Sequence, residues 1–96
     1  MRTPGYTTQF ERDLRLMQRR GKDTGKLKTI LTALINEEPL PERQRDHPLL
    51  GNYKGRRECH VEPDWLLIYK LVNNEIIFER MLSGSSHGIP QIWGVE

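Results

Sequence analysis

The residues of this chain best suited to move protons are its three histidines, His47, His60 and His87. An imidazole has an unperturbed pKa of about 6.5, so it can take or give a proton near neutral pH. Asp64 and Arg80 add a carboxylate that can orient an imidazole and a cation that can stabilise negative charge. Cleavage of RNA without a metal ion needs a proton taken from the ribose 2′-hydroxyl, a proton given to the 5′-oxygen, and a cation at the phosphate. Histidine, aspartate and arginine side chains together can meet these three needs.

Each candidate also has an ordinary structural interpretation. His47 could cap a turn, His60 could lie on a sheet surface, and His87 could belong to a disordered tail. Asp64 follows a proline as turn residues often do, and a tryptophan such as Trp65 at the start of a strand is usually part of the core. The chemical interpretation therefore depends on the convergence of these residues on one region of a sheet.

A metal site is the rival use of the same residues. Cys59 and His60 are adjacent in a predicted strand, so they point to opposite faces and cannot both bind one zinc ion. The nearby carboxylates appear scattered rather than clustered as a magnesium site would require: Asp46, Glu58, Glu62 and Asp64. We therefore expect no metal ion and no other cofactor.

Two helices are predicted in the first half, over about residues 8–20 and 24–37. Thr8 and Glu11 have the spacing of a capping box, and Gly21 is a typical helix stop. Apolar residues then recur at helical spacing, first at Phe10, Leu14 and Met17, and then at Leu27, Ile30, Leu31, Leu34 and Ile35. The prolines at 39 and 41 end the second helix, and residues 36–46 form a polar connection.

Three strands are predicted in the second half, over about residues 53–61, 65–72 and 75–82, followed by a tail over 83–96. Pro63-Asp64 and Asn73-Asn74 have the composition of turns, and a strand in the first six residues is weakened by Pro4 and Gly5. The predicted class is α+β, with two N-terminal helices packed on a small, mainly antiparallel sheet.

A simple register places three residues in one row across the sheet. Pairing Val72 with Glu75 sets Leu67 opposite Arg80, and a symmetric Pro63-Asp64 turn sets His60 opposite Leu67. His60 and Arg80 would then lie about 10 Å apart on one face, with room for a phosphate between them. A bulge beside Pro63 would break this row.

Composition limits the class of protein. A chain of 96 residues corresponds to one domain, and its net charge of +2 is only a weak indication of an anionic partner. One cysteine excludes an intramolecular disulfide and favours a reducing compartment, and no apolar run approaches a membrane span. We expect a cytoplasmic protein that does not contact a membrane.

Basic residues crowd the helical half and a short segment before the sheet. On the helices an ordinary solvated face is the favoured interpretation. Lys54, Arg56 and Arg57, which lie near the predicted site, become candidate phosphate contacts if the chain cuts RNA.

The stretch DHPLLGNYKGRRECHVEPDWLLIYKL, followed by IIFER, resembles the YafQ branch of the RelE superfamily of bacterial toxins. The resemblance runs from about Thr8 to Arg80 and includes QFERDLRLMQRR and KLKTILTALINEEPLP. It implies a RelE-like fold and a ribosome-dependent endoribonuclease that cleaves messenger RNA, with active-site positions at His47, His60, Asp64, Arg80 and His87. In the family the C-terminal histidine is the favoured general acid, and the upstream His and Asp are favoured as base and orienting groups. Trp65 matches a tryptophan that lines the site.

The resemblance is less close in the tail. The link between Arg80 and His87 is three residues longer than in the family, and Trp93 is the nearest match to a closing phenylalanine. The implied partners are a small antitoxin, the ribosome with its mRNA, and operator DNA through the antitoxin complex alone. The alternatives are a non-catalytic binding module on the same scaffold and a nucleic-acid-binding regulator acting alone. The first would be expected to lack the histidines, and no helix-turn-helix signal supports the second.

Overall fold

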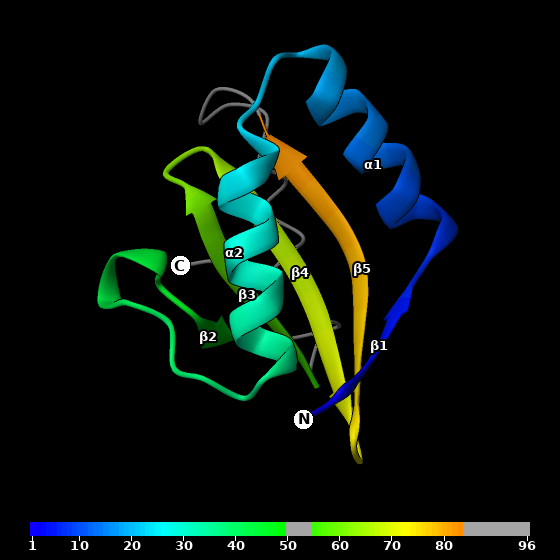
Figure 1. The fold of residues 1–96 in the computed structure, drawn as a ribbon, viewed down its shortest axis with the longest axis vertical. Coiled ribbons are helices and arrows are strands. Elements are labelled where there is room, and N and C mark those ends of the chain that lie inside the picture. The colour runs from blue at the N-terminus through cyan, green and yellow to red at the C-terminus, as the bar shows by residue number, and fades with distance from the viewer. Residues whose placement is uncertain (50–54, 84–96) are drawn as a thin grey trace.

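The computed structural model describes residues 1–49 and 55–83 of the chain. In this part a five-stranded sheet carries both longer helices on one face (Figure 1). In spatial order the strands are β1 (Thr3–Tyr6), β5 (Glu75–Ser83), β4 (Trp65–Val72), β3 (Arg56–Glu62) and β2 (His47–Pro48). The helices are α1 (Thr8–Arg19), α2 (Thr24–Ile35) and the short 3-10 helix η1 (Glu42–Gln44). β1 is parallel to β5 and the other pairs are antiparallel, which confirms the predicted α+β class.

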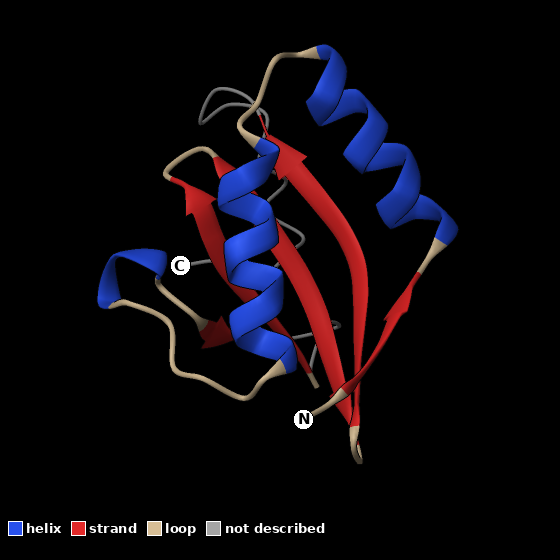
Figure 2. Cartoon of the chain, viewed as in Figure 1, coloured by secondary structure: helices blue, strands red, loops and turns tan. Residues whose placement is uncertain are grey.

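Both long helices begin and end close to the predicted residues. The N-cap of α1 is Thr7, whose hydroxyl accepts a hydrogen bond from the amide of Phe10, so the cap predicted at Thr8 lies one residue too late. The chain leaves α1 through Gly21 at a φ of 75°, a left-handed conformation that glycine adopts at no steric cost. Asp23 caps α2, which crosses in front of β3 and β4, whereas α1 lies beside β5 (Figure 2).

The two strands at the edges of the sheet were not predicted. β1 forms although it contains Pro4 and Gly5, because an edge strand needs hydrogen bonds on only one side. β2 has two residues and pairs His47 with Glu58. The β1–β5 pairing joins segments that are distant in sequence, and β2 is too short to show an alternating pattern, so local patterns predict neither strand.

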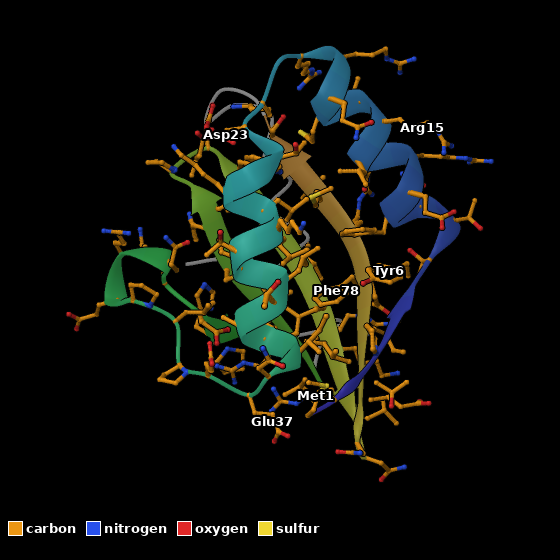
Figure 3. All side chains as sticks on the ribbon, viewed as in Figure 1. Met1, Tyr6, Arg15, Asp23, Glu37 and Phe78 are labelled. Atoms are coloured by element: carbon orange, nitrogen blue, oxygen red, sulfur yellow. The ribbon has the colours of Figure 1, made fainter. Side chains whose placement is uncertain are left out.

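Side chains separate cleanly onto the two faces of the sheet. The helix face carries the main core, and Phe78 of β5 stacks on Tyr6 of β1 with ring centroids 5.5 Å apart (Figure 3). The opposite face, here called the far face, carries a second small cluster of Leu49 and Ile68 with Leu82 packed against it. Charged residues of the far face are therefore flanked by apolar ones.

The predicted row of His60, Leu67 and Arg80 is wrong because the sheet has two irregularities. The hairpin of β4 and β5 starts as predicted at Val72 and Glu75, but a register shift between Ile68 and Tyr69 sets Arg80 opposite Ile68. A second shift, between His60 and Glu62, sets His60 opposite Leu66. Leu66 and Ile68 are two residues apart in one strand, so His60 and Arg80 still share the far face, in neighbouring rows.

Candidate active site

Two histidines from different strands meet at one carboxylate on the far face. The Nε2 atom of His47 lies 3.2 Å from Oε1 of Glu58, and the Nε2 atom of His60 lies 3.5 Å from the same oxygen. The geometry follows from the sheet, since His47 is opposite Glu58 across the β2–β3 pair and His60 follows Glu58 by two residues in β3. These three residues are called the His-Glu-His cluster below.

Glu58 is fully buried, whereas the side chains of His47 and His60 keep 33% and 12% of their exposure. Burial raises the pKa of the Glu58 carboxyl, and the two neighbouring histidines partly oppose this effect. A substrate can therefore reach the imidazoles but not the carboxylate. When ionised, Glu58 would orient both rings and stabilise a positive charge on either one.

The same cluster has the donor atoms of a metal site, a combination that the sequence interpretation missed. Its two imidazole nitrogens and one carboxylate oxygen all lie within 4.8 Å of one another. Imidazole and carboxylate ligands suit ions such as Cu²⁺ and Zn²⁺. The expected separation of Cys59 from His60 is confirmed, because Cys59 is buried in the helix-face core, where burial raises the pKa of its thiol.

Arg80 lies on the far face two strands away from the His-Glu-His cluster. It is opposite Ile68, which in turn is opposite Glu58, so these residues form one row across β5, β4 and β3. Its Nε atom lies 3.5 Å from Oδ2 of Asp13 in α1. The structure thus places a guanidinium on the same face as the two imidazoles.

Asp64 and Trp65 lie at the β3–β4 turn and interact with Lys22 rather than with the cluster. The ammonium of Lys22 lies 3.6 Å from Oδ1 of Asp64 and 5.9 Å from the centre of the Trp65 ring. Trp65 is fully buried in the helix-face core. Trp65 is thus a core residue, as tryptophans at the start of a strand usually are, and its ring has no exposed surface that RNA could contact in this conformation.

The two candidate phosphate-binding arginines that the structure describes, Arg56 and Arg57, bind different partners within the protein. Arg56 pairs with Glu79 of β5. Arg57 donates from Nε to Oδ1 of Asp46 at 3.2 Å and to the hydroxyl of Tyr69 at 3.3 Å. Each arginine is already held by protein groups. Three further predicted residues, Lys54, His87 and Trp93, lie outside the described residues.

Two functional candidates lie outside the predicted site: Glu58, which was considered only as a possible magnesium ligand, and Asp13, which was not considered. The spacing of Glu58 and His60 in a strand was a usable signal, since residues two apart share a face. Asp13 gave no comparable signal, because its contact with Arg80 joins residues 67 positions apart that meet only in the folded chain.

A cavity of about 470 Å³ lies between α2, the connection that follows it and the end of β3. His60 forms part of its wall, together with apolar residues such as Ile30 and Leu40 and with the basic residues Lys26 and Arg43. Of the three cluster residues, His60 alone lines this cavity, which has both apolar and cationic walls. Among the described residues, no helix is long and apolar enough to cross a membrane.

Comparison with known proteins finds relatives in both sequence and fold. The chain is 53% identical over 76 residues to the mRNA interferase toxin YafQ of Escherichia coli K12, a match that covers 78% of this chain and 83% of the relative. The crystal structure of YafQ from E. coli BL21(DE3) has a TM-score of 0.82 at 46% identity, covering 91% of this chain and 98% of that one. YafQ in the E. coli DinJ–YafQ complex has a TM-score of 0.81 at 49% identity, covering 86% and 93%.

A copper-bound mutant toxin from Helicobacter pylori is also similar, with a TM-score of 0.84 at 33% identity over 88% of this chain and 97% of that one. The family model described as the bacterial toxin YafQ of type II toxin–antitoxin systems matches residues 2–88. This match spans most of the chain, and the relatives share its fold as well as its sequence. The chain therefore belongs to the YafQ family of bacterial toxins of type II toxin–antitoxin systems.

Proposed function

We propose that this protein is a ribosome-dependent endoribonuclease that cleaves messenger RNA during translation and thereby stops protein synthesis. The observation that carries the proposal is the placement of two imidazoles on one buried carboxylate, on the same face as Arg80. Its E. coli relative is named an mRNA interferase toxin. The substrate, messenger RNA, is inferred from the relative, and the acid–base chemistry is inferred from the residues of this chain.

The proposed reaction is proton transfer without a metal ion. The ribose 2′-oxygen attacks the phosphorus while an imidazole of His47 or His60 takes the hydroxyl proton. The bond from phosphorus to the 5′-oxygen then breaks, and His87 gives that oxygen a proton. Glu58 orients the receiving imidazole, and Arg80 stabilises the additional negative charge on the phosphate.

Asp64 remains a candidate for the orienting role that the family resemblance implies. Its side chain is half exposed and lies 3.6 Å from Lys22, so it is accessible to a substrate that approaches this turn. Glu58 is the more direct candidate for the same role, since it touches both imidazoles.

Contacts with ribosomal RNA would use exposed cations away from the cleavage site. Arg12, Arg15 and Arg19 lie on the exposed side of α1, and Arg15 extends away from the sheet (Figure 3). Phosphate contacts of this kind give affinity without sequence selectivity. Such a surface would suit a toxin that finds its message on the ribosome.

The proposed protein partner is a small cognate antitoxin. The E. coli relative is known in complex with DinJ, and a corresponding antitoxin would neutralise this chain. Operator DNA would be bound through the toxin–antitoxin complex. The proposed location of both proteins is the cytoplasm, where messenger RNA is translated.

We further propose that a transition-metal ion would inhibit the enzyme by occupying the His-Glu-His cluster. The Helicobacter relative is copper-bound, and the cluster offers suitable donors. A metal ion bound at Nε2 would displace the contact with Glu58 and make the other ring nitrogen less basic, so the imidazole would be a weaker proton acceptor. The metal would therefore compete with catalysis.

The proposal is tested by a brief pulse of expression followed by mapping of cleaved messages in cells. We expect translation and growth to stop, with new 5′ ends inside translated regions, and co-expression of the neighbouring antitoxin gene to restore growth. The matched control is the double variant His47→Ala/His60→Ala at equal soluble expression. Arrested translation with intact messages would favour a non-catalytic binding module, and normal growth would contradict the toxin proposal.

Ribosome dependence is tested in purified components. The same message is incubated with the protein either naked or on programmed ribosomes, and the fraction cleaved is followed with time. We expect cleavage on ribosomes and little on naked RNA. Equal rates on both substrates would contradict the dependence on ribosomes while leaving the nuclease proposal intact.

A further inference from the structure

Helix α1 takes the place of a strand beside the second half of β5. β1 pairs with β5 only from Glu75 to Phe78. Beyond that point the hydroxyl of Thr7 donates to the carbonyl of Glu79 at 2.7 Å, and Oδ2 of Asp13 accepts from the amide of Met81 at 2.8 Å. Side chains of α1 and its cap thus satisfy backbone groups that a neighbouring strand would otherwise bind.

These two contacts bracket the irregularity that decides where Arg80 points. Phe78 and Met81 are both buried in the helix-face core although they are three residues apart, so the regular alternation is interrupted between them. The register shift sets Arg80 in the row of Ile68 on the far face. A regular strand would place residue 80 on the same face as Phe78, which is the helix face.

Asp13 also contacts the side chain of Arg80. Its Oδ2 atom, which accepts the Met81 amide, lies 3.5 Å from Nε of Arg80, and its Oδ1 accepts a hydrogen bond from Nε2 of Gln9 at 2.9 Å. Asp13 is only 6% exposed, and it is one of two buried charged residues in the described part of the chain. A carboxylate so enclosed is costly to bury unless its partners are well placed.

We propose that Asp13 is a positioning residue for the cleavage reaction, acting through Arg80. A carboxylate beside Nε restricts the rotation of the guanidinium and so sets the direction of its two terminal amino groups. The same carboxylate holds the bulge, so one residue of α1 contributes to both the backbone position of Arg80 and the orientation of its cation. The inference rests on the proposed function, in which Arg80 stabilises charge on the scissile phosphate.

The test is a double-mutant cycle between Asp13 and Arg80, measured as single-turnover cleavage on programmed ribosomes. Asp13→Asn keeps an oxygen that can accept the Met81 amide but removes the charge beside Arg80. We expect it to lower the maximal rate about 10–100-fold, since small errors in position are costly to catalysis, with little change in half-saturating ribosome concentration. In the Arg80→Ala background, the same substitution should change the rate less than about twofold.

The matched control is Asp23→Asn, which removes the charge of a carboxylate in the same way but at the N-cap of α2, where it accepts a hydrogen bond from the Gly25 amide. It should cleave at the rate of the unmodified protein. Equal losses from Asp13→Asn in the two backgrounds would show a role in folding alone and overturn the proposal. Wild-type rates for Asp13→Asn would also overturn it.

A measurement independent of cleavage separates this inference from the proposed function. In the unmodified protein the Nε–H proton of Arg80 should give a resolved NMR signal that exchanges slowly with water. Asp13→Asn should accelerate its exchange at least tenfold, while Asp23→Asn should not. If the chain does not cut RNA but this difference holds, the proposed function fails and the positioning contact stands; unchanged exchange overturns the contact itself.

Discussion

Glu58 and His47 lie opposite each other on paired strands, with 3.2 Å between Oε1 and Nε2, and the carboxylate is fully buried while the imidazole is partly exposed. A buried carboxylate that contacts an accessible imidazole can orient the ring and stabilise its positive charge without contacting the substrate. The arrangement also has a thermodynamic consequence, because an ionised carboxylate is costly to bury.

Glu58→Gln is expected to stabilise the fold at alkaline pH while impairing cleavage. Burial raises the pKa of the Glu58 carboxyl, so the folded state binds more protons than the unfolded state between the ordinary and the raised pKa. The stability of the unmodified protein therefore falls as pH rises through this window. Thermal melts from pH 3 to 9 should show a higher Tm for Glu58→Gln above the window and no difference below it, with cleavage reduced about 10–100-fold.

Glu62→Gln is the control for that experiment, and its effect on the Tm should have the opposite sign. Hydrogen bonds from Lys26 and then Lys22 lower the pKa of Glu62, so its charge contributes stability above its ordinary pKa that is lost at acid pH. Glu62→Gln should therefore lower the Tm slightly at neutral pH. A Glu58→Gln variant that melts below the unmodified protein at pH 8 would contradict the assigned direction.

His87→Ala is expected to nearly abolish cleavage, since general acids typically contribute about 10²–10⁴-fold. His47 and His60 lie together at Glu58, where they are suited to take the proton of the 2′-hydroxyl. The measurement is single-turnover cleavage on programmed ribosomes with EDTA present, comparing His47→Ala, His60→Ala and His87→Ala. Equal rates for His87→Ala and the unmodified protein would assign the proton to another group.

Added Cu²⁺ or Zn²⁺ is expected to inhibit cleavage, and EDTA is expected to restore it. The metal would bind the donors of His47, Glu58 and His60, which lie within 4.8 Å of one another. Calorimetric titration should show one site that His47→Ala weakens by about 10-fold or more. Faster cleavage with metal, or loss of activity in EDTA alone, would contradict the metal-independent mechanism.

Tyr69→Phe is expected to lower stability without abolishing cleavage. The Tyr69 hydroxyl donates to Oδ1 of Asp46 at 2.5 Å from the helix-face core, and its loss should cost about 1–3 kcal/mol because the acceptor is charged. Urea unfolding should show a lower midpoint with an unchanged slope, and cleavage should stay within about threefold. Tyr6→Phe, at an exposed side chain, is the control; a hundredfold loss of cleavage in Tyr69→Phe would instead connect this hydroxyl to the site.

The sequence alone determined the elements whose causes are local. Apolar spacing and capping residues predicted both helices to within two residues of their observed ends, and Asn73, found at a φ of 53°, turns the β4–β5 hairpin as predicted. The motif around HVEPDW indicated the family, which the comparison with known proteins confirmed. These features depend on neighbours along the chain, which a single sequence displays.

Only the tertiary structure decided which residues meet. β1 depends on hydrogen bonds to the distant strand β5, and the bulge near Arg80 is held by Asp13 of α1. A one-residue shift of this kind reverses the face of every side chain beyond it. For this reason the predicted row through Leu67 was wrong, although His60 and Arg80 do share a face. The meeting of His47 with Glu58, and of Asp13 with Arg80, required the folded sheet and helix, because each contact joins elements whose relative position is set by packing rather than by local sequence.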